Sequence, residues 1–343
     1  MRPQKQSVTI QHVAKAAGVS VSTVSRVLNG KVDVAEETKE RIEAVIKQLG
    51  YASSLAARSM RSKKNQLIGL IMPDIAYPFA WEVMKGVNRA IAESEYDLLV
   101  YTRGDVRKYG TAAHEQQIVS LLNGSITDGL LIVAPVSEEF FSTAPIVSVD
   151  HLAVRPGYPS VHSTNYEGAL EAMRHLLALG HRRIGFISGR GELLSAQRRF
   201  QAYQNALAEA GIAFDEALIA RGDYTTATGH DCARQLLSLP QPPTAIFAAN
   251  DQSAMGVYQA AQEMGKEIPR DLSVIGFDNI PEAAYLNLTT VDQFIAEMGY
   301  QAAKTLFRLI EGQTLETKIQ QLPTRLVVRA SCQAPLPTQV NAS

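Results

Sequence analysis

The sequence has little cysteine and no long apolar run. Cys232 and Cys332 are its only cysteines, and neither belongs to a CxxC pair or a Cys/His cluster. We therefore expect isolated thiols in a reducing compartment, with neither a disulfide framework nor a zinc site. No segment reaches the about 18 consecutive apolar residues that a membrane-spanning helix needs. The first seven residues are polar and predict no export signal, so the sequence favours a cytoplasmic protein without a membrane partner.

The short signatures of common catalytic sites are also missing. The sequence has no Walker loop, no HExxH and no GxSxG, and Gly189-x-Gly191 lacks the third glycine of a dinucleotide-binding loop. Its seven histidines are scattered, and His12 is expected on the polar face of a helix, solvated or contacting a phosphate. The sequence patterns do not indicate a nucleophile together with a base and an oxyanion donor. We expect neither an enzyme nor a metal or cofactor site.

The charges are unevenly distributed, although the net charge is only −1. Residues 1–65 contain 12 Lys+Arg and 5 Asp+Glu, whereas the rest of the chain contains 21 and 29. A basic segment attached to an acidic body is typical of a nucleic-acid-binding module joined to a second domain. The length of 343 residues allows two or three domains.

The basic segment contains the pattern of a helix-turn-helix. Thr9 can cap a helix over residues 10–17, and Gly18 supplies the tight turn that follows it. Ser20 can then cap a second helix of the kind that lies in a DNA major groove. A third helix is predicted for residues 35–49. Any small three-helix domain shares this periodicity, and the basic charge is what favours DNA binding.

The residues facing outward at the start of the second helix are the expected DNA contacts. Candidates for reading base edges, with Arg26 best suited to a guanine, are Val21, Ser22 and Arg26. Candidates for setting the register on phosphates are Thr9, Ser20, Thr23, Ser25 and Asn29.

From residue 67 onward, apolar runs alternate with amphipathic segments. Strands are predicted at 67–72, 98–102, 129–133, 145–149, 184–187, 245–248 and 273–277. Helices are predicted at 81–93, 111–122, 166–179, 196–210, 225–238, 253–264 and 296–310. Wholly apolar strands separated by helices are typical of parallel sheets covered on both faces. Two such series in tandem predict an α/β core of two Rossmann-like lobes.

Polar and aromatic residues follow these strands, where open α/β sheets bind ligands. The candidates are Asp74, Tyr77, Phe79, Asp150, Arg199, Tyr224, Asn250, Asp278 and Gln293. Their chemistry suits the CH faces and hydroxyl edges of a sugar, and would also suit a purine or an organic acid. Arg199 and Asp278 are the strongest candidates, because buried charges need partners. Alternatively, Tyr77 and Phe79 only pack in the core, and Asp251 is the N-cap of the helix that follows it.

The N-terminal residues also carry a family resemblance. The run Thr9-Ile10-x-x-Val13-Ala14-x-x-Ala17-Gly18-Val19-Ser20-x-x-Thr23-Val24-Ser25-Arg26-Val27-Leu28-Asn29, then Val34-x-Glu36-Glu37-Thr38 and Gly50-Tyr51, resembles the lactose/galactose repressor (LacI/GalR) family. The resemblance extends to Val328. It implies an all-α helix-turn-helix headpiece over 8–51, a hinge over 52–65, a periplasmic-binding-protein-like core over 66–332 and a tail over 333–343. Within the core it implies one lobe of about 66–161 with 293–321 and another of about 162–290 with 322–332.

In that family the hinge forms a short helix on operator DNA and places an apolar side chain in the minor groove. Met60 stands at the matching position, where Leu is usual, and Arg58 is a further candidate contact. Ser53 and Ser54 replace the usual Pro-Asn. A segment of about eight residues cannot hold a helix alone in water, so a plain basic linker is the alternative.

The resemblance implies a transcriptional repressor of a carbohydrate-utilisation operon. It would bind double-stranded palindromic operator DNA and be released by a small effector, a sugar or sugar phosphate. The tail contains Pro335 and Pro337 and no heptads, so we expect a homodimer and no coiled-coil tetramer. A corepressor-dependent regulator, with a purine-type ligand or a protein partner, is one alternative. A solute-binding protein and a sugar-converting enzyme are the others.

Overall fold

The computed structural model describes residues 8–28, 33–51, 65–102, 111–124, 126–151 and 156–336. The chain divides into two compact units, residues 1–65 and 66–343. The first unit contains three helices in its described residues: α1 (Ile10–Ala17), α2 (Val21–Leu28) and α3 (Glu36–Leu49). Each helix supplies one completely buried side chain to a shared core, namely Val13, Val24 and Ile42. Gly18 and Gly50 end α1 and α3 with φ of +66° and +60°, a conformation that glycine adopts without strain.

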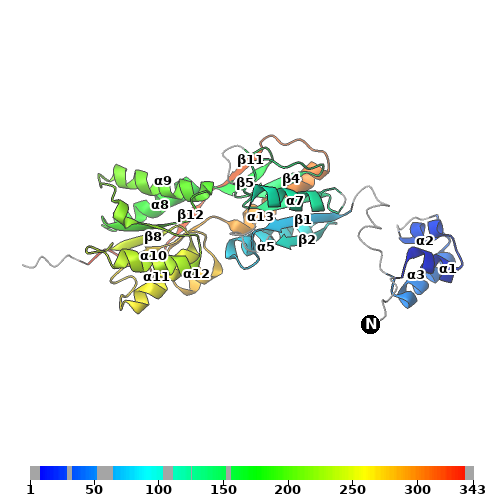
Figure 1. Ribbon diagram of the computed structural model, residues 1–343, viewed down its shortest axis with the longest axis horizontal. Coiled ribbons are helices and arrows are strands. Elements are labelled where there is room, and N and C mark those ends of the chain that lie inside the picture. The colour runs from blue at the N-terminus through cyan, green and yellow to red at the C-terminus, as the bar shows by residue number, and fades with distance from the viewer. Residues whose placement is uncertain are drawn as a thin grey trace, which may run out of the picture. The chain divides into compact units, whose positions relative to one another are not determined.

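The second unit has two parallel sheets, each in its own lobe (Figure 1). The first sheet has the strand order β11-β5-β4-β3-β1-β2. Its strands are β1 (Leu67–Met72), β2 (Asp97–Thr102), β3 (Gly129–Val133), β4 (Ile146–Val149), β5 (Ser160–Ser163) and β11 (Ile319–Leu322). The second sheet has the order β7-β6-β8-β9, formed by β6 (Ile184–Ser188), β7 (Ile219–Arg221), β8 (Ala245–Ala248) and β9 (Ser273–Ile275). A separate antiparallel pair joins β10 (Thr290–Asp292) to β12 (Arg325–Val327).

Helices cover both sheets. Those of the first lobe are α5 (Pro78–Ala92), α7 (Ala112–Leu122) and α13 (Ile295–Ile310). Those of the second lobe are α8 (Asn165–Ala178), α9 (Leu194–Glu209), α10 (Thr226–Leu237), α11 (Asp251–Glu263), α12 (Pro281–Tyr285) and the 3-10 turn η1 (Glu216–Leu218). Figure 1 shows the late helix α13, in orange, within the lobe formed by the early strands. In the described residues, the chain passes between the lobes after β5, after β10 and after β11.

The two-lobe α/β architecture predicted from the alternating pattern is confirmed. The described helices include none that is both long and apolar enough to cross a membrane.

Helices α5 and α13 approach closely because each has a glycine at the contact. A Cβ on Gly86 would lie 1.7 Å from the backbone oxygen of Ala296. A Cβ on Gly299 would lie 2.1 Å from the backbone oxygen of Val83. Backbone atoms cannot move aside as a flexible side chain does. We expect Gly86→Ala to lower the free energy of unfolding by about 3 kcal/mol.

Urea denaturation of the variant measures this effect. Gly191→Ala is the control, because a Cβ there would meet nothing within 4 Å. Equal urea midpoints for Gly86→Ala and Gly191→Ala would show that α5 and α13 can move apart without loss of stability.

Candidate functional site

A cavity of about 90 Å³ lies at the carboxyl ends of strands from both lobes. The candidate ligand residues that line it are Tyr77, Phe79, Asp150, Arg199, Tyr224, Asn250, Asp278 and Gln293. Asp74 is not part of this lining, and its Oδ1 accepts a hydrogen bond from the backbone N–H of Ala76 at 2.9 Å. The structure thus brings together all of these candidates except Asp74.

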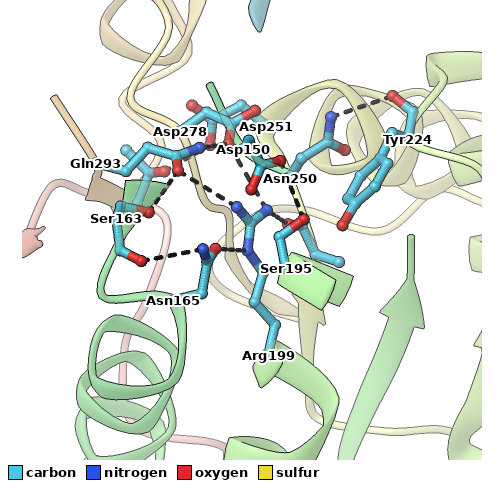
Figure 2. A network of polar contacts seen from close by, with 12 residues as sticks. Asp150, Ser163, Asn165, Ser195, Arg199, Tyr224, Asn250, Asp251, Asp278 and Gln293 are labelled. Atoms are coloured by element: carbon cyan, nitrogen blue, oxygen red, sulfur yellow. Dashed lines mark hydrogen bonds and ion pairs between the residues drawn. The ribbon is translucent and has the colours of Figure 1, made fainter. Parts of the chain in front are cut away.

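Arg199 is the centre of a buried polar network (Figure 2). It projects from α9 and is only 3% exposed. Its Nε donates to Asn165 Oδ1 at 2.9 Å and its Nη1 to the backbone oxygen of Ala249 at 2.5 Å. Nη1 also lies 3.7 Å from Asp278 Oδ1, and the guanidinium carbon lies 3.7 Å from the centre of the Phe277 ring. A planar cation with many donors is suited to hold several acceptors in one fixed arrangement.

Gln293 connects the network across the lobes. Its Nε2 donates to Asp278 Oδ1 at 2.6 Å, and its Oε1 accepts from Ser163 Oγ at 2.8 Å. Ser163 ends β5 in the first lobe, whereas Asp278 follows β9 in the second. Gln293 itself lies between β10 and α13, where the chain crosses from one lobe to the other. The cavity residues therefore contact a segment that crosses between the lobes, and this segment must bend when the lobes move.

Asn250, which lines the cavity, also caps α11, and Asp251 does not. Asn250 is the N-cap of α11, because its Oδ1 accepts from the Ser253 N–H at 2.9 Å. Asp251 was the alternative candidate for that cap, but it is completely buried and accepts hydrogen bonds from Thr290 Oγ1 and the Ile280 N–H. The Asn250 amide also donates to the backbone oxygen of Tyr224 at 3.1 Å. Asn250 thus holds the loop that carries Tyr224 while lining the cavity.

The ring of Tyr224 lies against a glycine. A Cβ on Gly189 would be 1.9 Å from a Tyr224 ring atom, so only glycine leaves room for this placement. The Tyr224 hydroxyl is buried beside Ser195, whose hydrogen bond opposes the rise that burial causes in the pKa of Tyr224. The Gly189-x-Gly191 pattern therefore serves an aromatic wall here.

Three cavity residues hold strained backbone. The φ angles of Asp150, Tyr224 and Asp278 are +54°, +74° and +124°. Each such conformation costs about 1–3 kcal/mol, and they gather at ligand sites.

Burial raises the pKa of two of the cavity carboxyls. Burial raises the pKa of Asp278 to about 7, although Arg199 and Gln293 oppose this effect. Burial likewise raises the pKa of Asp150, opposed first by Arg199 and more weakly by a hydrogen bond from Ser195. An Asp with a raised folded pKa stabilises the folded state at low pH, and that contribution is lost as pH rises through the folded value.

For Asp278 this window runs from its ordinary value of 3.8 to about 7. We expect the difference in unfolding free energy between the protein and its Asp278→Asn variant to fall by about 1.4 kcal/mol per pH unit across the window. Above pH 7 the difference should stay constant. Urea denaturation from pH 5 to pH 8 measures both curves. Parallel curves would show that Asp278 keeps an ordinary pKa.

The candidate DNA contacts of the first unit gather at the start of α2. Ser20 caps this helix, because its Oγ accepts from the Thr23 N–H at 3.1 Å. Val21, Ser22 and Arg26 have exposed side chains. The Arg26 Nη1 lies 3.3 Å from Asp33 Oδ2 in a solvent-exposed ion pair. A hydroxyl, an apolar group and a guanidinium are thus available on one face of a capped helix.

Other candidates lie away from that face or outside the described residues. Thr9 begins α1, where its backbone N–H donates to His12 Nδ1 at 3.1 Å, so His12 takes part in the helix cap. Ser25 is partly exposed on α2. Asn29, Arg58 and Met60 lie outside the described residues, as do the hinge apart from Asn65 and residues 337–343 of the tail.

No group of three or more His, Cys, Asp or Glu side chains in the described ranges is arranged to hold a metal ion.

Residues of the site that were not among the candidates include Ser163, Asn165 and Gly189. Ser163 and Asn165 flank the end of β5, a strand that the sequence did not predict. Gly189 was considered as part of a dinucleotide motif and as part of the loop after strand 184–187, but not as the neighbour of Tyr224. Its signal is the position directly after the apolar strand β6.

Comparison with known proteins identifies the family to which this architecture belongs. Residues 9–54 match the family model of bacterial regulatory proteins, lacI family, and residues 173–332 match that of a periplasmic binding protein-like domain. The HTH-type transcriptional repressor CytR of Escherichia coli (strain K12) is 33% identical over 345 residues, covering 97% of this chain and 98% of that protein. The ribose operon repressor of Haemophilus influenzae is 34% identical over 330 residues, covering 94% and 98%.

Solved structures agree with these relatives. The Lac repressor dimer bound to operator and the anti-inducer ONPF has a TM-score of 0.81 at 27% identity, over 96% of this chain and 100% of that one. A complex of the transcriptional regulator CelR with cellobiose has a TM-score of 0.70 at 29% identity, over 94% and 99%. Together, fold and relatives define a DNA-binding transcriptional regulator with a ligand-binding core. The chain belongs to the lacI family of bacterial regulatory proteins, as the run from Thr9 to Asn29 indicated.

Proposed function

We propose that the protein is a homodimeric repressor of a carbohydrate-utilisation operon that is released from a palindromic operator by a small hydroxylated effector. The observation that carries this proposal is the cavity network, in which Arg199, Asp278 and Gln293 join both lobes through one buried set of hydrogen bonds. A ligand that replaces some of these hydrogen bonds changes the angle between the lobes that the protein favours. Effector binding in the cavity is then coupled allosterically to operator binding.

The cavity chemistry supports a sugar or sugar phosphate as the effector. The carboxyls of Asp150 and Asp278 accept hydrogen bonds from hydroxyls, Arg199 donates them, and the Ser195 and Tyr224 hydroxyls do either. Tyr77 and Phe79 add aromatic faces that suit the CH face of a sugar ring. The relatives named for ribose and cellobiose support the same class of ligand.

On the DNA side, we propose that the exposed face of α2 enters the major groove. Val21, Ser22 and Arg26 would read base edges, and Ser20, Thr23, Ser25 and Thr9 would set the register on phosphates. The Lac repressor was solved as an operator-bound dimer, which supports a dimer reading two half-sites. Hinge contacts by Arg58 and Met60, and a phosphate contact by Asn29, remain sequence-based proposals. A cytoplasmic location follows from this role.

The test is selection of bound fragments from the source genome by the purified protein at near-physiological salt. We expect a palindromic site beside genes for the uptake or breakdown of a carbohydrate, and release of that site by the corresponding sugar. If a purine or another compound tightened operator binding, the effector would be a corepressor and not an inducer. Absence of any specific fragment would contradict the regulator assignment.

We also propose that the cavity binds its effector without converting it. Release of the operator by the sugar, followed by recovery of the sugar unchanged, is the expected result. Turnover by the purified protein would contradict this.

A further inference from the structure

The turn that follows β9 joins the cavity to a segment that crosses between the lobes. Asp278 lines the cavity, and its Oδ1 accepts from Gln293 Nε2 at 2.6 Å (Figure 2). Asn279, the next residue, is not part of that lining, and its Nδ2 donates to Asp292 Oδ2 at 3.1 Å. Two neighbours in the turn therefore bond to two neighbours in the crossing segment. One of these pairs lies inside the cavity and the other outside it.

Asp292 fixes the start of α13. Its Oδ1 accepts from the Phe294 N–H at 2.8 Å, two residues further on. Phe294 lies directly before α13 and has a φ of +54°, which is unfavourable for a bulky residue unless its surroundings hold it. Arg325 Nη2 lies 3.9 Å from Asp292 Oδ2 and belongs to β12, the strand that follows the crossing after β11. The carboxyl of Asp292 thus contacts two of the crossings.

The amide of Asn279 is held from the second lobe. Its Oδ1 accepts from Arg329 Nη2 at 2.8 Å, and Arg329 Nη1 donates to the backbone oxygen of Leu288 at 2.7 Å. A guanidinium only donates and a carboxylate only accepts, so the amide between Arg329 and Asp292 has one possible orientation. The φ of Asn279 is +56°, a conformation that asparagine adopts more readily than most residues. Its backbone therefore belongs to the second lobe, and its side chain reaches the crossing segment.

We propose that Asn279 is a positioning residue that transmits effector binding in the cavity to the angle between the lobes. An effector that bonds to Asp278 competes with Gln293 for that carboxyl. Asn279 moves with Asp278, because the two are adjacent in one turn. Its bond to Asp292 carries the movement to residues 292–294 and so to the beginning of α13. Since α13 packs in the core of the first lobe, that lobe follows.

This inference rests on the proposed release of an operator by an effector, and it names a residue that carries the response. Without the Asn279 side chain the effector should still bind, because no residue of the cavity lining is removed. Its binding should then change the angle between the lobes less. Effector affinity and effector response are therefore separable properties of the protein.

The test compares Asn279→Gly with the unchanged full-length protein. Glycine adopts a φ of +56° without strain, so the substitution removes the amide and keeps the backbone. D-ribose, cellobiose and D-glucose are titrated by calorimetry, and binding of the selected operator fragment is measured with and without each sugar. We expect the affinity for the releasing sugar to stay within about three-fold, while the factor by which it weakens operator binding falls about five-fold or more.

Asn287→Gly is the matched control. Asn287 also has a left-handed backbone, with a φ of +50°, and it is exposed. It lies outside the cavity lining and outside the crossing segments. The same pair of residue types is exchanged in the same backbone conformation, so any general effect of glycine is shared. This variant should keep both the affinity for the sugar and the response to it.

An exchange of the two bonded side chains gives a stricter test. Asn279→Asp places two carboxylates against each other and should lose the response. In Asn279→Asp/Asp292→Asn, the amide at 292 donates to the carboxylate at 279 and still accepts from the Phe294 N–H. The response should therefore return in the double variant. A general loss of stability would not be reversed in this way.

Hydrogen exchange of the free protein tests the contact without DNA or sugar. Peptides covering residues 290–297 should exchange faster in Asn279→Gly and not in Asn287→Gly. Equal exchange in this segment would overturn the proposal, as would an undiminished response in Asn279→Gly or a double variant without recovery. If the unchanged protein binds no operator, or no sugar releases it, the proposed function fails instead, and hydrogen exchange alone then decides whether Asn279 holds the crossing segment.

Discussion

Replacing Arg199 with methionine is expected to lower the free energy of unfolding by about 3–5 kcal/mol, because the buried partners of the guanidinium are left behind. Asp278 loses its nearby cation, and Asn165 and the backbone oxygen of Ala249 lose their donors. Methionine fills a similar volume and keeps the contact with the Phe277 ring, so the loss reports on polar contacts. A compound that binds the cavity and raises the melting temperature of the unchanged protein should fail to do so for the variant. Urea denaturation and thermal shift measure the two effects.

The double variant Arg199→Met/Asp278→Asn separates charge from packing. If the uncompensated carboxyl causes the loss, removing it in the same chain restores part of the stability. A double variant as unstable as the sum of the two single variants would show that the pair does not interact. The operator affinity of all three proteins in the absence of effector gives a further control.

Replacing Arg26 with alanine is expected to weaken operator binding by about 1–3 kcal/mol and to relax the choice of base at one position of each half-site. The side chain is exposed on α2, and its ion pair with Asp33 is solvent-exposed, so its removal leaves the headpiece folded. Binding to the selected operator and to a set of single-base variants measures both effects.

Arg41→Ala is the matched control for charge. Arg41 is exposed on α3, so its loss removes one positive charge from the same unit without touching α2. It should weaken binding to all sequences equally, if at all. Asp33→Asn frees Arg26 from its ion pair and should not weaken binding. A loss of specificity in Arg41→Ala equal to that in Arg26→Ala would contradict the assignment of α2.

The sequence predicted the strands in which apolar residues dominate and missed the short or mostly polar ones. β1 and β3 are buried along their whole length and were predicted from their composition. β5 reads SVHS and β11 reads IQQL, and both lie at the polar edge of the first sheet. Their strand structure depends on pairing with each other, across nearly half the chain, which local composition does not encode.

The candidate site was predictable as a set of positions but not as a set of partners. Parallel strands place their carboxyl ends at one edge, so the residues after them were expected to meet. Which of two adjacent residues caps a helix depends on tertiary contacts: Asn250 caps α11, while Asp251 bonds to Thr290 from a distant segment. The space that Gly189 leaves for Tyr224 likewise exists only once two loops meet.

The late position of α13 and β11 in the chain has a consequence for synthesis. The ribosome releases the chain from the N-terminus, and domains fold as their residues emerge. The first lobe begins at β1, but its covering helix ends at Ile310 and its edge strand ends at Leu322. Until those residues emerge, the nascent chain exposes the apolar face that α13 later covers and the open side of β5. The lobe that is begun first is therefore completed only after nearly all of the second lobe has been made, and a chain cut before residue 295 lacks the helix that covers the first lobe.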